Sequence, residues 1–309
     1  MADRLTSAYS GDTITVDSIV SDPTWLQGRA YDNLDGTDLV KAIFRNGGTN
    51  DGVVAYHEAA APFLNDDSEN IAEFAEIPVA DVNLGKVKKL VSEKTGIGVR
   101  ISREMRRKNK IDQVNLRMTA MQNTMVKNGV EGAVRAFHAA DVTTMAVSED
   151  WGKDGANPMR DIRAGKREVN LAKAPNRKDA LMGYRADTLL ANPATIDLLL
   201  FHEAVQKFYN GAAAVENPVY KGITPQTIGG LRVVESAWLA EDELYILQSG
   251  VVGFESTTDP LTITPLYSEH GENGYGGSNQ SWRMDAFRER ILGVDNPKAV
   301  VKLTGFQAS

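Results

Sequence analysis

The chain has 309 residues, of which 42% are apolar and 24% charged, values typical of globular proteins rather than disordered ones. It contains no cysteine, which excludes disulfides, thiolate zinc sites and cysteine nucleophiles and is typical of a reducing compartment. Its net charge is −7, so the chain has no overall surplus of Lys and Arg, and this argues against sequence-specific nucleic-acid recognition. No apolar run approaches the roughly 20 residues that span a bilayer.

The first 67 residues are rich in Gly, Asp, Asn and Ser, with single apolar residues between them, and this composition predicts an extended arm. One short helix is predicted at Thr37–Arg45, with Leu39, Val40 and Ile43 on its apolar side. A segment of this kind buries too little surface to fold alone. A disordered tail is the alternative interpretation.

The next segment, Ile71–Glu104, predicts a long β-hairpin with its turn at Asn83–Gly85. Alternation on the return strand predicts one apolar face and one basic face: the apolar face holds Val87, Val91, Ile97, Val99 and Ile101, and the basic face holds Lys86, Lys88, Lys94 and Arg100. A two-stranded ribbon is only marginally stable alone. We therefore expect this hairpin to pack against another molecule.

A short helix, Arg103–Asn109, is predicted after Ser102, which supplies its cap. A long helix is then predicted from Asp112, as its cap, to about Ala139. Apolar residues recur along it at spacings of three and four, and three of them are methionines: Met118, Met121 and Met125. We interpret this stripe as core rather than as a cofactor site.

The rest of the chain alternates helix and strand signals. Asn157–Pro158 opens a helix that carries the basic run Arg160–Arg167, which we interpret as a solvated or interface-facing surface in preference to a phosphate site. A second Asn-Pro pair opens a helix that ends near Phe208. Strands are predicted at Thr188–Ala191, around Leu231–Glu235, Glu243–Gln248 and Leu261–Pro265, and in the C-terminal residues. This mixture predicts an α+β fold.

The sequence contains no convincing catalytic, cofactor-binding or metal-binding residues. Its four histidines are His57, His138, His202 and His270; the pair His202–Glu203 begins like a zinc-protease motif, but Gln206 stands where the second histidine is needed. Serine-hydrolase and phosphate-loop motifs are absent. Asp66, Asp67 and Glu69 are typical of a solvated acidic turn rather than a calcium loop. We therefore expect a structural protein that is not an enzyme.

The order of four segments carries a resemblance to a known family. They are AEIPVADVNLGKVKKLVSEKTGIGVRISREM, the long helix IDQVNLRMTAMQNTMVKNGVEGAVRAFHAA, ADTLLANPATIDLL, and RERILGVDNPKAVVKLTGF. Over most of the chain this order resembles the major capsid proteins of tailed double-stranded DNA phages, which have the Hong Kong 97-type fold.

The resemblance implies four parts. They are an N-terminal arm (1–50), an extended loop region (51–101), a peripheral domain (102–185 with 283–309) and an axial domain (186–282). It also implies subunit-interface contacts through Lys86, Lys88, Lys89 and Lys94 in the extended loop.

The implied function is self-assembly into hexamers and pentamers that form an icosahedral head shell around double-stranded DNA. The implied location is the virion, with assembly in the host cytoplasm, and the implied partners are a separate scaffolding protein and a portal protein. The acidic balance predicts that DNA is contacted weakly and without sequence preference. One family member cross-links lysine to asparagine between subunits, but Asn279 and Glu289 do not fall in the required register here, so we expect non-covalent shells. Two alternatives remain open: an encapsulin-like bacterial nanocompartment shell, and an α+β enzyme.

Overall fold

The computed structural model describes residues 16, 39–58, 62–153, 155–175, 180–209, 227–271 and 274–306. The helices are α3 (Leu39–Ile43), α4 (Arg103–Arg107), α5 (Ile111–Ala139), α6 (Pro158–Asn170), α7 (Pro193–Phe201), α8 (Glu203–Tyr209) and the 3-10 helix η2 (Pro297–Ala299). The strands are β1 (Arg45–Thr49), β2 (Val53–Glu58), β3 (Lys86–Val91), β4 (Glu93–Ser102), β5 (Thr143–Ala146), β6 (Thr188–Ala191), β7 (Thr227–Ile228), β8 (Leu231–Glu235), β9 (Glu243–Leu247), β10 (Phe254–Ile263), β11 (Tyr267–Ser268), β12 (Ser281–Gly293) and β13 (Val300–Thr304). The α+β prediction is confirmed, and antiparallel pairs outnumber parallel ones among the described strands.

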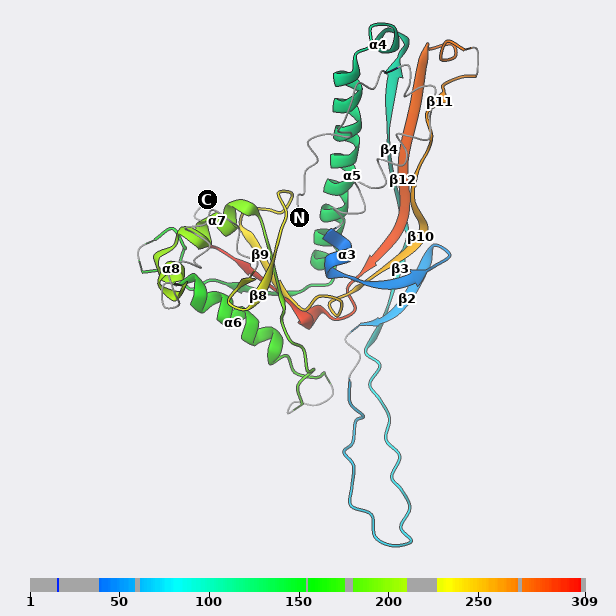
Figure 1. Cartoon of the computed structure of the whole chain (residues 1–309). Helices are drawn as coiled ribbons and strands as arrows, with labels where there is room; N and C mark the ends of the chain where they lie inside the picture. The colour runs from blue at the N-terminus through cyan, green and yellow to red at the C-terminus, as the bar shows by residue number, and fades with distance from the viewer. Residues whose placement is uncertain are drawn as a thin grey trace.

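An elongated body is built from one sheet and the long helix. Its strands run in the order β1-β10-β12-β11, and β4 pairs with β12 from Ser102–Ser281 to Glu93–Arg290. Helix α5 lies along this sheet (Figure 1) and its 29 residues extend about 43 Å at 1.5 Å per residue. The methionine stripe of α5 is buried against the sheet residues Ile101 and Met284, so its interpretation as core is confirmed.

A second sheet of six strands has the order β5-β13-β9-β6-β8-β7. Neighbouring residues of β9 face opposite sides: Ile246 packs against Gly165 of α6, whereas the ring of Tyr245 lies 5.2 Å from that of Phe137 at the end of α5. Phe44, which follows α3, also stacks on Phe137, with 5.7 Å between the ring centroids. The sheet is therefore covered by α6 on one face and by α3 and the end of α5 on the other.

The predicted hairpin Ile71–Glu104 is wrong in its pairing. β3 does form an antiparallel ribbon, but its partner is β2, which lies before Ile71, and Val53 pairs with Val91 and Glu58 with Lys86. At Ser92 the chain leaves the ribbon and continues as β4, which pairs inside its own chain with β12. Between the strands, residues 62–85 run out and back as a long loop (Figure 1).

Because the chain changes its strand partner at Ser92, the single apolar face that alternation predicted is exposed on one side of Ser92 and buried on the other. Val87 and Val91 are 60% and 70% exposed on the ribbon, whereas Ile97 and Val99 pack against the core of the elongated body and Ile101 is buried in it. Strict alternation does not continue through a residue at which a strand changes its partner.

Most predicted caps and bounds agree with the structure. The side chains of Ser102, Asn157 and Asn192 cap α4, α6 and α7, and β6 has the predicted bounds. The predicted cap Asp112 is wrong, because Lys110 precedes α5 and makes no side-chain cap bond. The helix expected to reach Phe208 is interrupted at His202, whose extended backbone separates α7 from α8.

Strand pairing also distributes the expected domain ranges between the two sheets. From the range 102–185, β5 and α6 join the six-stranded sheet; from the range 186–282, β10 and β11 join the elongated sheet.

Of the arm, residues 1–38 lie outside the described residues apart from Val16, which is buried in the same core cluster as Ile101 and donates its backbone N–H to the side-chain oxygen of Asn109 at 2.8 Å. A helix is confirmed within the predicted range Thr37–Arg45, as α3, with Leu39, Val40 and Ile43 buried, but it ends at Ile43 and Arg45 begins β1. None of the described helices is both long and apolar enough to cross a membrane.

Candidate assembly surfaces

The extended loop, residues 62–85, is both acidic and apolar. It has no Lys or Arg, and its six acidic residues are Asp66, Asp67, Glu69, Glu73, Glu76 and Asp81. Three apolar side chains on it are largely exposed: Phe74 (98%), Val79 (94%) and Ile77 (72%). A bridge between Leu64 and Val82 joins its two halves near the base. Several large apolar side chains exposed on one segment mark an interaction surface.

The four lysines expected at the interface lie at the base of this loop rather than at its tip. Lys88 forms an ion pair with Glu58 on the neighbouring strand. The ammonium of Lys94 lies 5.2 Å from the centroid of the Phe287 ring, at a distance typical of a cation–π contact. Lys86 and Lys89 are exposed on β3. The structure therefore places three of them on β3 and Lys94 on β4, while the loop that extends beyond them is acidic.

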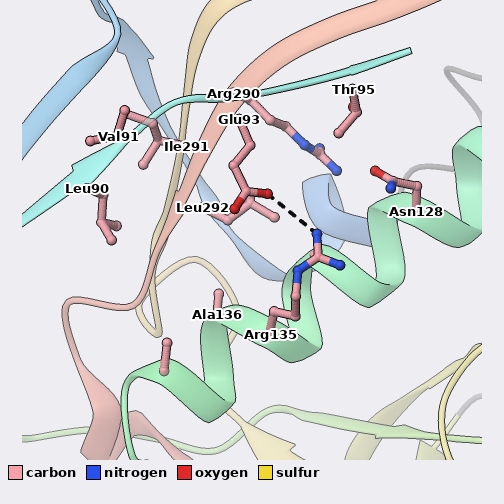
Figure 2. Close-up of a pocket in the computed structure, with 12 residues that line it drawn as sticks. Leu90, Val91, Glu93, Thr95, Asn128, Arg135, Ala136, Arg290, Ile291 and Leu292 are labelled. Carbon is pink, nitrogen blue, oxygen red and sulfur yellow. Dashed lines mark ion pairs between the residues drawn. The ribbon is translucent and has the colours of Figure 1, made fainter. Parts of the chain in front are cut away.

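The base of the ribbon meets α5 in a cleft of about 190 Å³. Figure 2 shows the cleft, with Glu93 of β4 reaching across it toward Arg135 of α5. The guanidinium of Arg135 lies 3.6 Å from the Glu93 carboxylate, and both side chains are more than half exposed. An exposed pair of this kind contributes only about 0–1 kcal/mol. The ribbon is therefore held at this point by a contact that is easily broken.

A basic end lies at the opposite extreme of the elongated body (Figure 1). We define it by α4 and the residues just after it: Arg103, Arg106, Arg107, Lys108 and Lys110, with Glu104 as the acidic member. Arg103 and Arg106 lie over the rings of Tyr275 and Trp282, at 4.7 and 5.1 Å from their centroids. These rings hold part of the basic end in place, while Arg107, Lys108 and Lys110 are exposed.

Beside the basic end, a buried carboxylate stabilises the sheet. Glu269 accepts hydrogen bonds from Arg100 at 2.7 Å and from the Ser281 hydroxyl at 3.1 Å. The hydrogen bonds from Arg100 hold the pKa of Glu269 at about 2, well below its ordinary value. This carboxylate therefore remains charged and ties β4 to the strand pair β11–β12.

His138, at the end of α5, lies in a group of polar side chains that connects the helix to the six-stranded sheet. The His138 ring nitrogen Nε2 lies 3.6 Å from the Glu243 carboxylate and 3.4 Å from the Tyr245 hydroxyl. Burial raises the pKa of Glu243, but hydrogen bonds from Lys302 and Tyr245 outweigh it and lower the pKa below its ordinary value. This group joins α5 to β9 and β13. Among the described residues, no three His, Asp or Glu side chains gather as metal ligands.

Sequence reasoning missed the acidic loop and the basic end. The signals were present: a stretch of 24 residues without a cation, and five cations within the eight residues 103–110. Their placement at opposite extremes of one body follows from the pairing of β2 with β3 and of β4 with β12, which the sequence pattern did not reveal.

Comparison with known proteins identifies relatives of this architecture. A family model described as phage capsid protein matches residues 85–303. No curated protein sequence matches significantly. Among solved structures, a virus-like particle protein from Pyrococcus furiosus is 15% identical with a TM-score of 0.56, covering 90% of this chain and 97% of its own. The mature capsid of bacteriophage PhiM1 is 13% identical with a TM-score of 0.56, covering 86% of each chain. A Mycobacterium phage Che8 structure is 13% identical with a TM-score of 0.55, covering 100% and 97%. These likenesses show the Hong Kong 97-type fold.

Proposed function

Because this chain belongs to the phage capsid protein family, we propose that it is the major capsid protein, which assembles into hexamers and pentamers and then into an icosahedral head shell around double-stranded DNA. Its role is structural rather than catalytic. The shell is part of the virion and assembles in the host cytoplasm. A separate scaffolding protein and a portal protein are its further partners.

The observation that carries this proposal is the extended loop. Phe74, Ile77 and Val79 are exposed far from either core, on a segment that the described part of the chain joins to the ribbon only near its base. These side chains contribute no hydrophobic stabilisation in the monomer, because apolar surface contributes only when it is removed from water. A partner that covers the loop would supply that burial.

Charge supports a second copy of the chain as the partner. The extended loop carries six carboxylates and no cation, while the basic end carries five cations and one carboxylate at the other extreme of the same molecule. Opposite charges at opposite ends attract copies head to tail and repel them head to head. The lysines at the base of the loop, Lys86, Lys88, Lys89 and Lys94, take part in the same subunit contact.

We propose that the subunit has the four expected parts: an arm within residues 1–50, an extended loop region within 51–101, a peripheral domain and an axial domain. Strand pairing, rather than the expected ranges, assigns the strands of the two larger sheets to the last two of these parts. The peripheral domain is the elongated body around α5, and the axial domain is the six-stranded sheet with α6, α7 and α8, so that β10 and β11 belong to the former and β5 and β13 to the latter.

Electron microscopy of the purified protein, alone and with a co-expressed scaffolding partner, tests the proposal. Closed shells of uniform diameter are expected. A protein that stays monomeric under all assembly conditions by light scattering would contradict it.

An encapsulin-like shell is the second candidate, since the described fold also resembles a virus-like particle protein of Pyrococcus furiosus. The two candidates differ in what the shell encloses. Mass spectrometry and nuclease-protected nucleic acid from shells purified from the native source decide between enclosed DNA, which we expect, and an enclosed protein cargo.

A further inference from the structure

Helix α6 presents a row of cations to solvent. Arg160, Arg163 and Arg167 are exposed and, at spacings of three and four residues, lie on one side of the helix. Lys166 stands at the edge of this row, with Nζ 3.2 Å from the carbonyl oxygen of Gly229. Together they line a surface hollow of about 680 Å³. We call these four residues the arginine face.

The orientation of the arginine face is fixed by the buried side of the same helix. Asp161 accepts hydrogen bonds from the Trp151 indole and the Ser148 hydroxyl, each at 2.9 Å. A side chain at Gly165 would lie 2.8 Å from Ile246, so the helix sits directly on the six-stranded sheet. The Asn157 cap defines its first turn. The backbone that carries the arginine face is therefore already ordered before a ligand binds.

The cations of this face are not neutralised by neighbours in the described part of the chain. Among the described residues, none of the ion pairs involves Arg160, Arg163 or Arg167. Glu168 is the one exposed acidic residue on α6, since Asp161 is buried. Such a concentration of positive charge, in a chain whose net charge is −7, creates a local attraction for anions.

We propose that the arginine face binds the phosphate backbone of double-stranded DNA without reading its sequence. Arg160 and Arg167 are separated by about 10 Å along the helix axis, at 1.5 Å per residue. That distance is close to the rise of three nucleotides on one strand, at about 3.4 Å each. Arginine is suited to phosphate because its guanidinium donates two parallel hydrogen bonds. The inference rests on the proposed function, which supplies the DNA, and it replaces the expectation of a merely solvated or interface-facing surface.

Salt dependence of DNA binding tests the arginine face on unassembled subunits. The triple variant Arg160→Gln/Arg163→Gln/Arg167→Gln is compared with the wild type, using a fluorescent 30-base-pair duplex at several salt concentrations. The matched control is Lys127→Gln/Lys153→Gln/Arg185→Gln, which removes the same charge from scattered exposed positions.

Three lost phosphate contacts are expected to reduce the slope of log K against log salt by about 3, at roughly 0.9 per contact. Between 50 and 200 mM salt, the wild type is expected to lose about 40-fold more affinity than the triple variant. The control should keep most of the wild-type slope, and shuffled duplex sequences should bind equally.

Three results would overturn the inference: an unchanged slope in the triple variant, an equal loss in the scattered control, or equally strong binding of poly-glutamate, which would assign the face to an acidic protein. Electron microscopy separates these outcomes from the proposed function. A triple variant that binds DNA normally but cannot close shells would make the face a subunit contact and leave the capsid role standing. If the wild type never assembles, but the triple variant shows the predicted loss of slope relative to it, the capsid role is overturned and the DNA contact is left standing.

Discussion

The exposed apolar side chains of the extended loop give the sharpest prediction. The variant Phe74→Ser/Ile77→Ser/Val79→Ser removes them without touching either core. Full burial of such side chains contributes about 1.5–3 kcal/mol each, or about 5–9 kcal/mol together. If contact with a neighbour covers half of this surface, each subunit contact loses about 2–4 kcal/mol. The folded monomer should lose less than about 0.5 kcal/mol, because these side chains are solvated there.

The assay compares assembly with monomer stability in the same protein. At about 1.4 kcal/mol for each tenfold change, the protein concentration needed for assembly should rise by about 30-fold to 1000-fold, as measured by light scattering and electron microscopy. Urea unfolding of unassembled subunits should give nearly the wild-type free energy of unfolding. The control Leu116→Ser/Phe201→Ser removes two apolar side chains that are also exposed, but outside the loop.

Deletion of the extended loop tests the same subunit contact. Glu58 and Lys86 are register partners on β2 and β3, so a two-residue Asn-Gly turn can join them directly and remove residues 59–85. This variant should fold and fail to close shells. Destabilisation of the subunit by more than about 1 kcal/mol would show that the loop packs inside its own chain. Normal assembly of either variant would show that the loop makes no essential subunit contact.

Three further outcomes are expected. Glu269→Gln should lower the melting temperature at pH 7 and have little effect near pH 2. Because the pKa of Glu269 is held at about 2, its stabilisation is complete above the ordinary pKa of 4.5 and is lost as the pH falls through 2. A difference in melting temperature from the wild type that persists at pH 2 would contradict this account. Phe137→Ala, at a fully buried ring between Phe44 and Tyr245, should lower the free energy of unfolding by about 3–5 kcal/mol in urea titrations, against less than about 0.5 for the exposed control Leu116→Ala. Boiled shells should run as one band of single-chain mass on a denaturing gel, and a ladder of oligomers would show covalent bonds between subunits.

Much of the local structure is determined by neighbouring residues and was predicted from them. The apolar spacing that includes Met118 and Met121 predicts α5, and the Asn-Pro pairs predict the first turns of α6 and α7. These features depend on hydrogen bonds and side-chain contacts within one or two turns, so the information that determines them is contiguous in the sequence. The order of such segments was also sufficient for the resemblance to phage capsid proteins.

The partners of the strands were decided only by the tertiary structure. Lys86–Val91 has a clear alternation, but nothing in it indicates that its partner is Val53–Glu58, which is separated from it by 27 residues of sequence, rather than the segment after Ile71. In the same way, Glu93–Ser102 is a strand by its pattern, yet its burial depends on Ser281–Arg290, far away in the sequence. A strand's hydrogen bonds are all made to another segment, so its pattern specifies a face and not a partner. This is why the sequence by itself determined the helices and the kind of protein, while the folded chain decided that the loop tip is acidic, that the lysines lie at its base, and that the basic end lies at the other extreme of the molecule.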